Sequence, residues 1–145
     1  MAWYNLKEMN LIKQEEMLPM LVSVCPSFAD KWQEHKEEYK DQENYFHYIA
    51  LADFARHLTE LEKREQTAEF EKVFQLVERF HFEGDDNVQN AVVVGLLENL
   101  KLNPEIEGET FVKYLNSESL KWWSEIGKFW SGKIHYIGET YDAES

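Results

Sequence analysis

The sequence contains one cysteine, three prolines and six glycines, and each shortage excludes a class of protein. A single thiol, Cys25, cannot form an internal disulfide, and we expect it to be buried and unreactive. Six scattered glycines leave no glycine-rich loop for phosphate. No apolar run approaches the roughly twenty residues that span a bilayer. These shortages predict a cytoplasmic protein that uses neither disulfides nor a membrane anchor.

Basic residues are also scarce, with fifteen Lys and Arg against twenty-eight Asp and Glu and a formal net charge of -13. This charge would repel phosphate backbones and anionic lipid, so nucleic acids and membrane surfaces are poor candidate partners. A basic protein would instead be attracted, with an association rate that falls as salt is added. The alternative is that the acidity serves only solubility.

The chain does have the length and the aromatic residues for one core. About two-thirds of the unfolded surface is buried at this size, and nine Phe, seven Tyr and five Trp supply apolar area. We therefore expect a single helical domain over residues 1–145. Residues after about 138 are acidic and are expected to form a frayed tail.

Apolar residues recur every three or four positions through most of the chain, which predicts an all-α fold. We expect helices at 10–25, 28–40, 45–65, 67–83, 85–102, 108–115 and 117–129. About six or seven helices joined by short turns would form an antiparallel helical array. A HEAT-like α-solenoid and a compact helix bundle both satisfy the pattern, and the sequence does not separate them.

Two helices carry distinctive patterns. Residues 91–97 are apolar nearly all round, so their helix is expected at the centre of the fold, and Gly95 within it predicts a close helix crossing. Trp122 and Trp123 are adjacent and cannot both face inward on one helix. Trp122 is therefore expected to be half exposed or covered by the tail. The inner face of this last helix is expected to hold Leu120, Trp123, Ile126, Gly127 and Trp130.

Acidic residues are concentrated between positions 83 and 109, where Lys101 is the only base. They flank one expected helix, so they should lie at both of its ends and form an acidic edge. The alternative is that these acids form an ordinary solvated face, and that those near the helix N-terminus interact favourably with the helix dipole. Exposed Trp is enriched at interface hot spots, although Trp122 could equally belong to the core. The candidate partner-binding residues are Asp85, Asp86, Glu98, Glu105, Glu107, Glu109 and Trp122.

Residues that could support catalysis are few. Glu78 and His81 form one Glu-x-x-His unit, whereas a diiron bundle needs two units and two further glutamates. Asp53 is expected to be partly buried and paired with His57 or Arg56. No Ser or Cys lies in a nucleophile-elbow context. We predict that the protein is not an enzyme and uses no cofactor or metal, with a diiron-like helical enzyme as the least favoured alternative.

The stretch from Gly84 to Leu100 reads GDDNVQNAVVVGLLENL. It resembles an uncharacterised family of small, acidic, all-helical (HEAT-like) bacterial proteins, some of which are similar to immunity proteins of polymorphic toxin systems. The resemblance is specific in the Asp-Asp-x-Val-x-Asn to Leu-Glu-Asn core and covers at best residues 45–102. It implies a helical fold and an immunity or inhibitor protein, but no particular catalytic or binding residue.

From the resemblance and the charge together, we expect a cytoplasmic protein that neutralises a basic toxin, such as a nuclease, by stoichiometric binding. A general helical scaffold or adaptor is the alternative. The sequence leaves the oligomeric state open.

Overall fold

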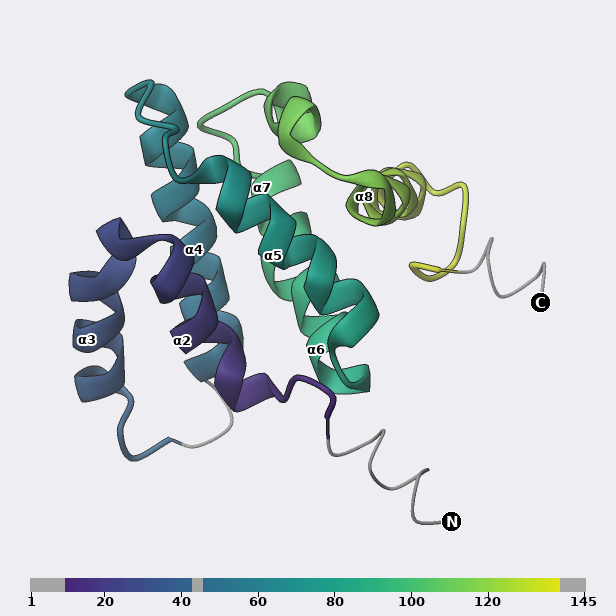
Figure 1. Ribbon diagram of the computed structural model, residues 1–145. Coiled ribbons are helices and arrows are strands. Elements are labelled where there is room, and N and C mark those ends of the chain that lie inside the picture. Colours follow the sequence, from purple (N-terminus) through teal and green to yellow (C-terminus); the bar gives the residue numbers. More distant parts are fainter. Residues whose placement is uncertain (1–9, 43–45, 139–145) are drawn as a thin grey trace, which may run out of the picture.

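The computed structural model describes residues 10–42 and 46–138, and these form an all-α helical array (Figure 1). No strand occurs within these two ranges. The acidic tail expected after about residue 138 lies outside them. The helices, labelled as in Figure 1, are α2 (Gln14–Val24), η1 (Pro26–Phe28), α3 (Ala29–Glu38), α4 (Phe46–Lys63), α5 (Phe70–Glu83), α6 (Asp86–Asn90), η2 (Ala91–Leu97), α7 (Glu98–Lys101), η3 (Gly108–Tyr114) and α8 (Ser117–Trp130).

The central helix of the array consists of α6, the π-helical stretch η2 and α7, which follow one another without a break. It contacts α2, α4, α5 and α8. Every side chain of η2 is buried except Val94, which is 37% exposed. A Cβ on Gly95 would lie 2.9 Å from Cδ1 of Leu51 in α4. The expected central position and the expected close crossing are both confirmed.

The start of the central helix is fixed by a local cap and by the N-terminal segment. Asp85 is the N-cap residue, and its carboxylate accepts the N–H of Val88 at 2.9 Å. The N–H of Asp85 donates to the carbonyl of Ile12, and the N–H of Ile12 donates to the carbonyl of Glu83. The turn between α5 and α6 is thereby held against the segment that precedes α2.

An aromatic cluster joins α5 to η3 beyond the other end of the central helix. Phe70 and Phe74 come from α5, and Phe111 and Tyr114 come from η3. The rings of Phe70 and Tyr114 meet edge to face with centroids 4.9 Å apart, a favourable geometry for aromatic pairs. This packing fixes where the chain turns into α8.

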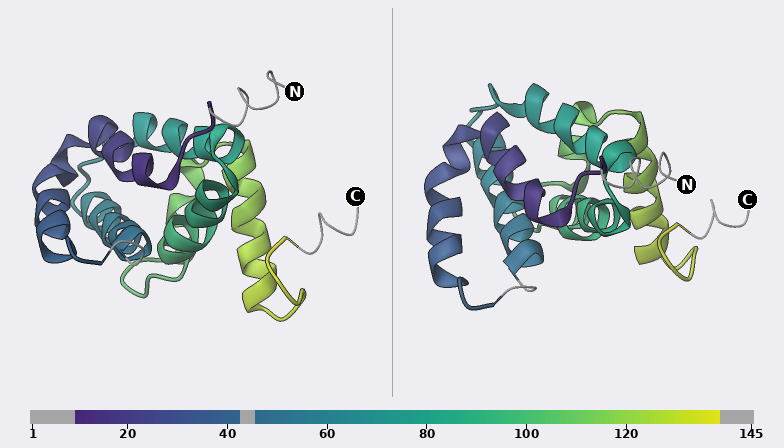
Figure 2. Two further views of the ribbon diagram at one scale, coloured as in Figure 1. Left: turned by 90° about the horizontal axis from the view of Figure 1, so that it is seen from below. Right: turned by 60° about the horizontal axis from the view of Figure 1, so that its bottom comes forward.

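Helix α8 crosses the array steeply: it is seen nearly end-on in Figure 1, and Figure 2 shows residues 131–138 turning back at its C-terminal end. Trp123 and Ile126 are buried, as expected. The same prediction is wrong for Leu120 and Trp130, which are 38% and 57% exposed. A helix at the edge of the array buries one narrow stripe, and these two side chains lie beside that stripe and beyond its end.

No helix in the described part of the chain combines the length and apolar character needed to cross a bilayer.

Candidate functional site

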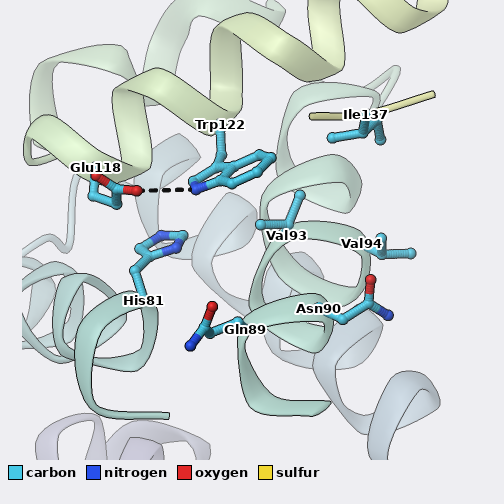
Figure 3. A pocket seen from close by; sticks show the side chains of 8 residues that line it. All are labelled: His81, Gln89, Asn90, Val93, Val94, Glu118, Trp122 and Ile137. Atoms are coloured by element: carbon cyan, nitrogen blue, oxygen red, sulfur yellow. Dashed lines mark hydrogen bonds between the residues drawn. The ribbon is translucent and has the colours of Figure 1, made fainter. Parts of the chain in front are cut away.

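A cavity of about 250 Å³ lies between α8, the end of α5 and the central helix (Figure 3). It brings together two residues that the sequence singled out for different reasons, Trp122 and His81. The lining residues are His81, Gln89, Asn90, Val93, Val94, Glu118, Trp122 and Ile137.

Trp122 is half-buried and forms one wall of this cavity. Its indole N–H donates to Glu118 at 3.3 Å. Ile137 lines the cavity beside Trp122, and a Cβ on Gly138 would lie 3.2 Å from the Trp122 ring. The C-terminal segment therefore partly covers Trp122, as expected from the adjacent Trp123.

Two amides form the opposite wall, and both use their nitrogen outside the cavity. Gln89 donates its side-chain N–H to the carbonyl of Gly84 at 2.9 Å. Asn90 donates to the hydroxyl of Tyr48 at 2.9 Å. In Figure 3 the amide oxygen of each residue points the other way, up toward the cavity. The amides thus present acceptors to the cavity.

His81 stands at the cavity edge as part of a hydrogen-bond chain with Ser119 and Glu78. The Ser119 hydroxyl donates to Glu78 at 3.0 Å, so its only proton is used there. His81 Nε2, 3.1 Å from that oxygen, must therefore be the donor, which leaves Nδ1 as an acceptor in the neutral ring. Burial lowers the pKa of His81 and favours this neutral form, against the opposing effect of Glu78.

Glu78 has a structural task that the Glu-x-x-His spacing does not reveal. Its carboxylate accepts the N–H groups of Glu118 at 2.8 Å and of Ser119 at 3.0 Å, in the first turn of α8. It caps a helix that is distant in sequence rather than facing a metal. No cluster of three His, Cys, Asp or Glu side chains suited to a metal ion occurs among residues 10–42 and 46–138.

The acidic candidates lie at the two ends of the central helix. Asp85 and Asp86 are at its N-terminus, whereas Glu98 is in its last turns. The sixteen residues from Asp86 to Lys101 place the ends about 20 Å apart. No acid occurs on the helix between Asp86 and Glu98. The expected single acidic edge is therefore two separate acidic ends, with Glu105, Glu107 and Glu109 following the second.

These acids differ in how far nearby groups neutralise them. Asp85 lies 3.9 Å from Lys13, and Glu109 lies 3.2 Å from Lys101. Glu98 accepts the indole N–H of Trp130 at 3.3 Å and forms no ion pair with the residues that the structure describes, so nothing among them neutralises its charge. Glu105 lies 3.8 Å from Lys63. Asp86 and Glu107 are exposed and form no ion pair within the described ranges.

A large exposed apolar side chain accompanies each acidic end. Phe82, 64% exposed, is on the last turn of α5, beside Asp85 and Asp86 in the chain. Trp130, the partner of Glu98, is exposed at the other end, together with Leu102. The sequence does not indicate this pairing, because its spacing predicts Trp130 on the inner face of the helix.

A charged groove lies between α3 and α4, and the sequence predicts only one of its ion pairs. Asp53 is half-exposed and pairs with Arg56, as expected, and with His35 of α3. The alternative prediction, that Asp53 pairs with His57, is wrong. Tertiary packing of α3 on α4 brings His35 opposite Asp53, a contact that spacing within one helix cannot indicate. Burial lowers the pKa of His35.

A second hydrogen-bond network, which joins Ser27, His57 and Glu69, is not predicted by the sequence analysis. The Ser27 hydroxyl donates to Glu69 at 2.5 Å, so His57 Nε2, 2.8 Å away, donates to the Ser27 oxygen. In a Ser-His-acid triad the imidazole lies between the other two groups, whereas here the serine does. The network holds η1 against the start of α5. Burial raises the pKa of the neighbouring Cys25 thiol to about 11, in keeping with an unreactive side chain.

Comparison with known proteins identifies a family. The family described as "Domain of unknown function (DUF7674)" matches residues 18–131, from α2 through α8. Neither the curated proteins nor the solved structures contain a match to this sequence. Since the matched region covers most of the chain, the protein belongs to the DUF7674 family.

Proposed function

We propose that the protein is a binding module that captures a basic partner protein in the cytoplasm and inhibits it by stoichiometric binding. The specific form of the proposal is an immunity protein that neutralises a toxin such as a nuclease. The resemblance of residues 84–100 to proteins of that kind motivates the toxin, and the net charge of -13 motivates a basic partner.

The observation that carries the proposal is the pairing of exposed apolar side chains with acids at both ends of the central helix. Acids that served only solubility would not require exposed aromatic side chains nearby, yet Phe82, three residues before Asp85 in the chain, and Trp130, which donates to Glu98, both face solvent. Interfaces commonly combine a buried aromatic anchor with a polar rim that excludes water. The two ends together offer this combination twice, about one helix length apart.

Electrostatics assign separate tasks to the two kinds of residue. Uncompensated carboxylates such as Asp86 and Glu107 would steer a basic partner during encounter and raise the association rate. The aromatic side chains would lose their contact with water in the complex and slow its dissociation. Salt should therefore weaken capture mainly by slowing association.

The test uses the tagged full-length protein as bait in a lysate of its own source organism at low salt, followed by elution in a salt gradient. A second bait carries Phe82→Ser and Trp130→Ser. A matched control bait carries Tyr136→Ser and Leu120→Ser, two other exposed apolar positions. We expect one basic protein in equimolar amount, released by moderate salt, retained by the control bait and lost from the second bait.

An adaptor would give a different result. Neutral or acidic proteins held regardless of salt would contradict the inhibitor proposal and favour a general helical scaffold. Equal retention of a basic protein by all three baits would remove Phe82 and Trp130 from the interface.

A further inference from the structure

The cavity beside Trp122 is lined by hydrogen-bond acceptors. The amide oxygens of Gln89 and Asn90 face it because both amide nitrogens donate elsewhere. Glu118 adds a carboxylate from the α8 side, where Oε1 accepts the Trp122 indole N–H and lies 2.9 Å from the ammonium of Lys121, so Oε2 is the oxygen left for a ligand. A ligand that satisfies these groups must supply several donors at once.

The rest of the lining is aromatic or aliphatic and suits a flat, cationic group. The face of an indole ring attracts a cation that lies over it. Lys121, which does not line the cavity, already lies 5.3 Å from the centre of the Trp122 ring. Val93, Val94 and Ile137 supply the apolar surface that would contact the aliphatic part of such a ligand.

The charge around the cavity also favours a cation. His81 is held neutral by burial, and the charged groups that act on it are Glu78, Glu118 and Lys121, which sum to one negative charge. The whole chain adds its net charge of -13. An anion would meet unfavourable potential here, as well as acceptors where it needs donors.

We propose that this cavity receives one arginine side chain of the basic partner protein, a step that rests on the proposed function and names the chemistry by which the partner is recognised. The guanidinium carries five donors in a planar fork and stacks on aromatic rings, whereas an ammonium is a compact point charge. Acceptors on two opposite walls, with a flat indole beside the carboxylate on the α8 wall, match the fork. The volume of about 250 Å³ is below the roughly 300–1,000 Å³ of most small-molecule sites, which favours a single side chain.

The experiment uses a blocked arginine, N-acetyl-arginine-N-methylamide, titrated into the full-length protein. The readout is the indole N–H resonance of Trp122, identified by its absence in Trp122→Phe. Trp130 provides a matched internal control, since its indole also donates to a carboxylate, Glu98, at 3.3 Å but outside the cavity. We expect a saturable shift at Trp122, a weaker response to blocked lysine, little response to blocked citrulline, and no saturable shift at Trp130.

Two variants locate the binding. Glu118→Gln keeps an acceptor for the indole but removes the charge, and we expect about tenfold weaker binding, as for loss of one hydrogen bond to a charged group. The control Glu71→Gln, at an exposed glutamate on α5 outside both proposed sites, should leave arginine binding unchanged. Should Glu118→Gln fail to fold, Val94→Phe narrows the cavity from a partly exposed position and should abolish the Trp122 shift.

Several results would overturn the assignment. They are the absence of a saturable Trp122 shift with blocked arginine, equal binding of blocked citrulline or lysine, and equal weakening by Glu71→Gln and Glu118→Gln. Because the probe is a small molecule, the outcome is independent of partner capture. Arginine binding without any captured basic protein would contradict the proposed inhibitor function but support the cavity as an arginine-binding site.

Discussion

Replacement of Glu78 should loosen α8, because this side chain caps a helix that has no cap of its own. Asn116, at the N-cap position of α8, makes no capping side-chain bond with the described residues. Glu78 accepts the first N–H groups of α8 in its place, and the Ser119 hydroxyl as well. Loss of a capping side chain costs about 0.5–2 kcal/mol. The Ser117 hydroxyl also donates to Glu78, at 3.4 Å, so four bonds are lost, and we expect Glu78→Ala near the upper limit, about 2 kcal/mol.

The same carboxylate should make the stability of α8 depend on pH. Burial by itself would raise the pKa of Glu78, but the bonds from Glu118 and Ser119 outweigh it and hold the pKa below its ordinary value. A depressed carboxyl pKa stabilises the fold above the pKa of the unfolded chain, and this contribution is lost as the pH falls through the folded value. The deficit of Glu78→Gln should therefore be present at pH 7 and disappear in acid.

The assay is urea unfolding followed by circular dichroism, at pH 7 and again near pH 3. A loss of about 2 kcal/mol corresponds to a fall of roughly 6 °C in Tm for a domain of this size. Glu71→Gln is the matched control, an exposed glutamate on the same helix, and should change stability by less than about 0.5 kcal/mol. A Glu78→Gln protein as stable as wild type at pH 7, or with an undiminished deficit in acid, would refute the capping argument.

Three further predictions concern packing, the thiol and the histidines. Gly84→Ala should lower the free energy of unfolding in urea by about 1–3 kcal/mol, because the new Cβ would overlap Val88 and lie 2.6 Å from the carbonyl oxygen of Phe80. Gly127→Ala, whose Cβ would have at least 3.4 Å of room, should not destabilise the protein, and equal losses in both variants would contradict the packing account. With its pKa raised from 9.0 to about 11, the Cys25 thiol should be alkylated at pH 8 at least about a hundredfold more slowly in the folded than in the unfolded protein, and equal rates would show that it is accessible. Stability should decline as the pH falls below about 6.5, since unfolded histidines then bind protons that the buried rings resist; a urea midpoint unchanged between pH 7.5 and 5.5 would contradict the lowered pKa values of His35, His47, His57 and His81.

The helices and the centre of the fold could be predicted because they depend on neighbours in sequence. The apolar run 91–97 needs partners on several sides wherever it is placed, and Gly95 is tolerated where another backbone approaches. Both inferences hold for any arrangement of the other helices. The burial of Leu120 and Trp130 was predicted wrongly because it depends on how much of α8 other helices cover, which periodicity does not reveal.

Contacts between distant segments account for most of what the sequence did not predict. Glu78 on α5 and Glu69 just before it are ordinary surface acids by their local spacing, yet Glu78 caps α8 and Glu69 accepts the N–H of Ser27 at 3.1 Å. The side chain of Glu125 is fully buried, with Lys128 3.6 Å away, although nothing in its local pattern differs from an exposed glutamate. Each position is set by tertiary packing.

The candidate site divides in the same way. Acids at both ends of one helix follow from chain connectivity, and so does a half-covered Trp122. The cavity does not, because its walls come from α5, the central helix, α8 and residue Ile137 of the C-terminal segment. Its acceptor character depends further on where the nitrogens of Gln89 and Asn90 donate.

The most direct test of the proposed function is the association rate constant of the captured basic partner, measured by stopped-flow fluorescence across a range of salt concentrations. The test variant carries Asp85→Asn, Asp86→Asn and Glu98→Gln; asparagine still caps α6. The control carries Asp30→Asn, Glu38→Gln and Glu71→Gln, an equal charge change at exposed acids on α3 and α5. We predict several-fold slower association and a shallower salt dependence for the test variant, and a much smaller change for the control. A rate that is independent of salt, or equally slowed in both variants, would contradict capture through the acidic ends of the central helix.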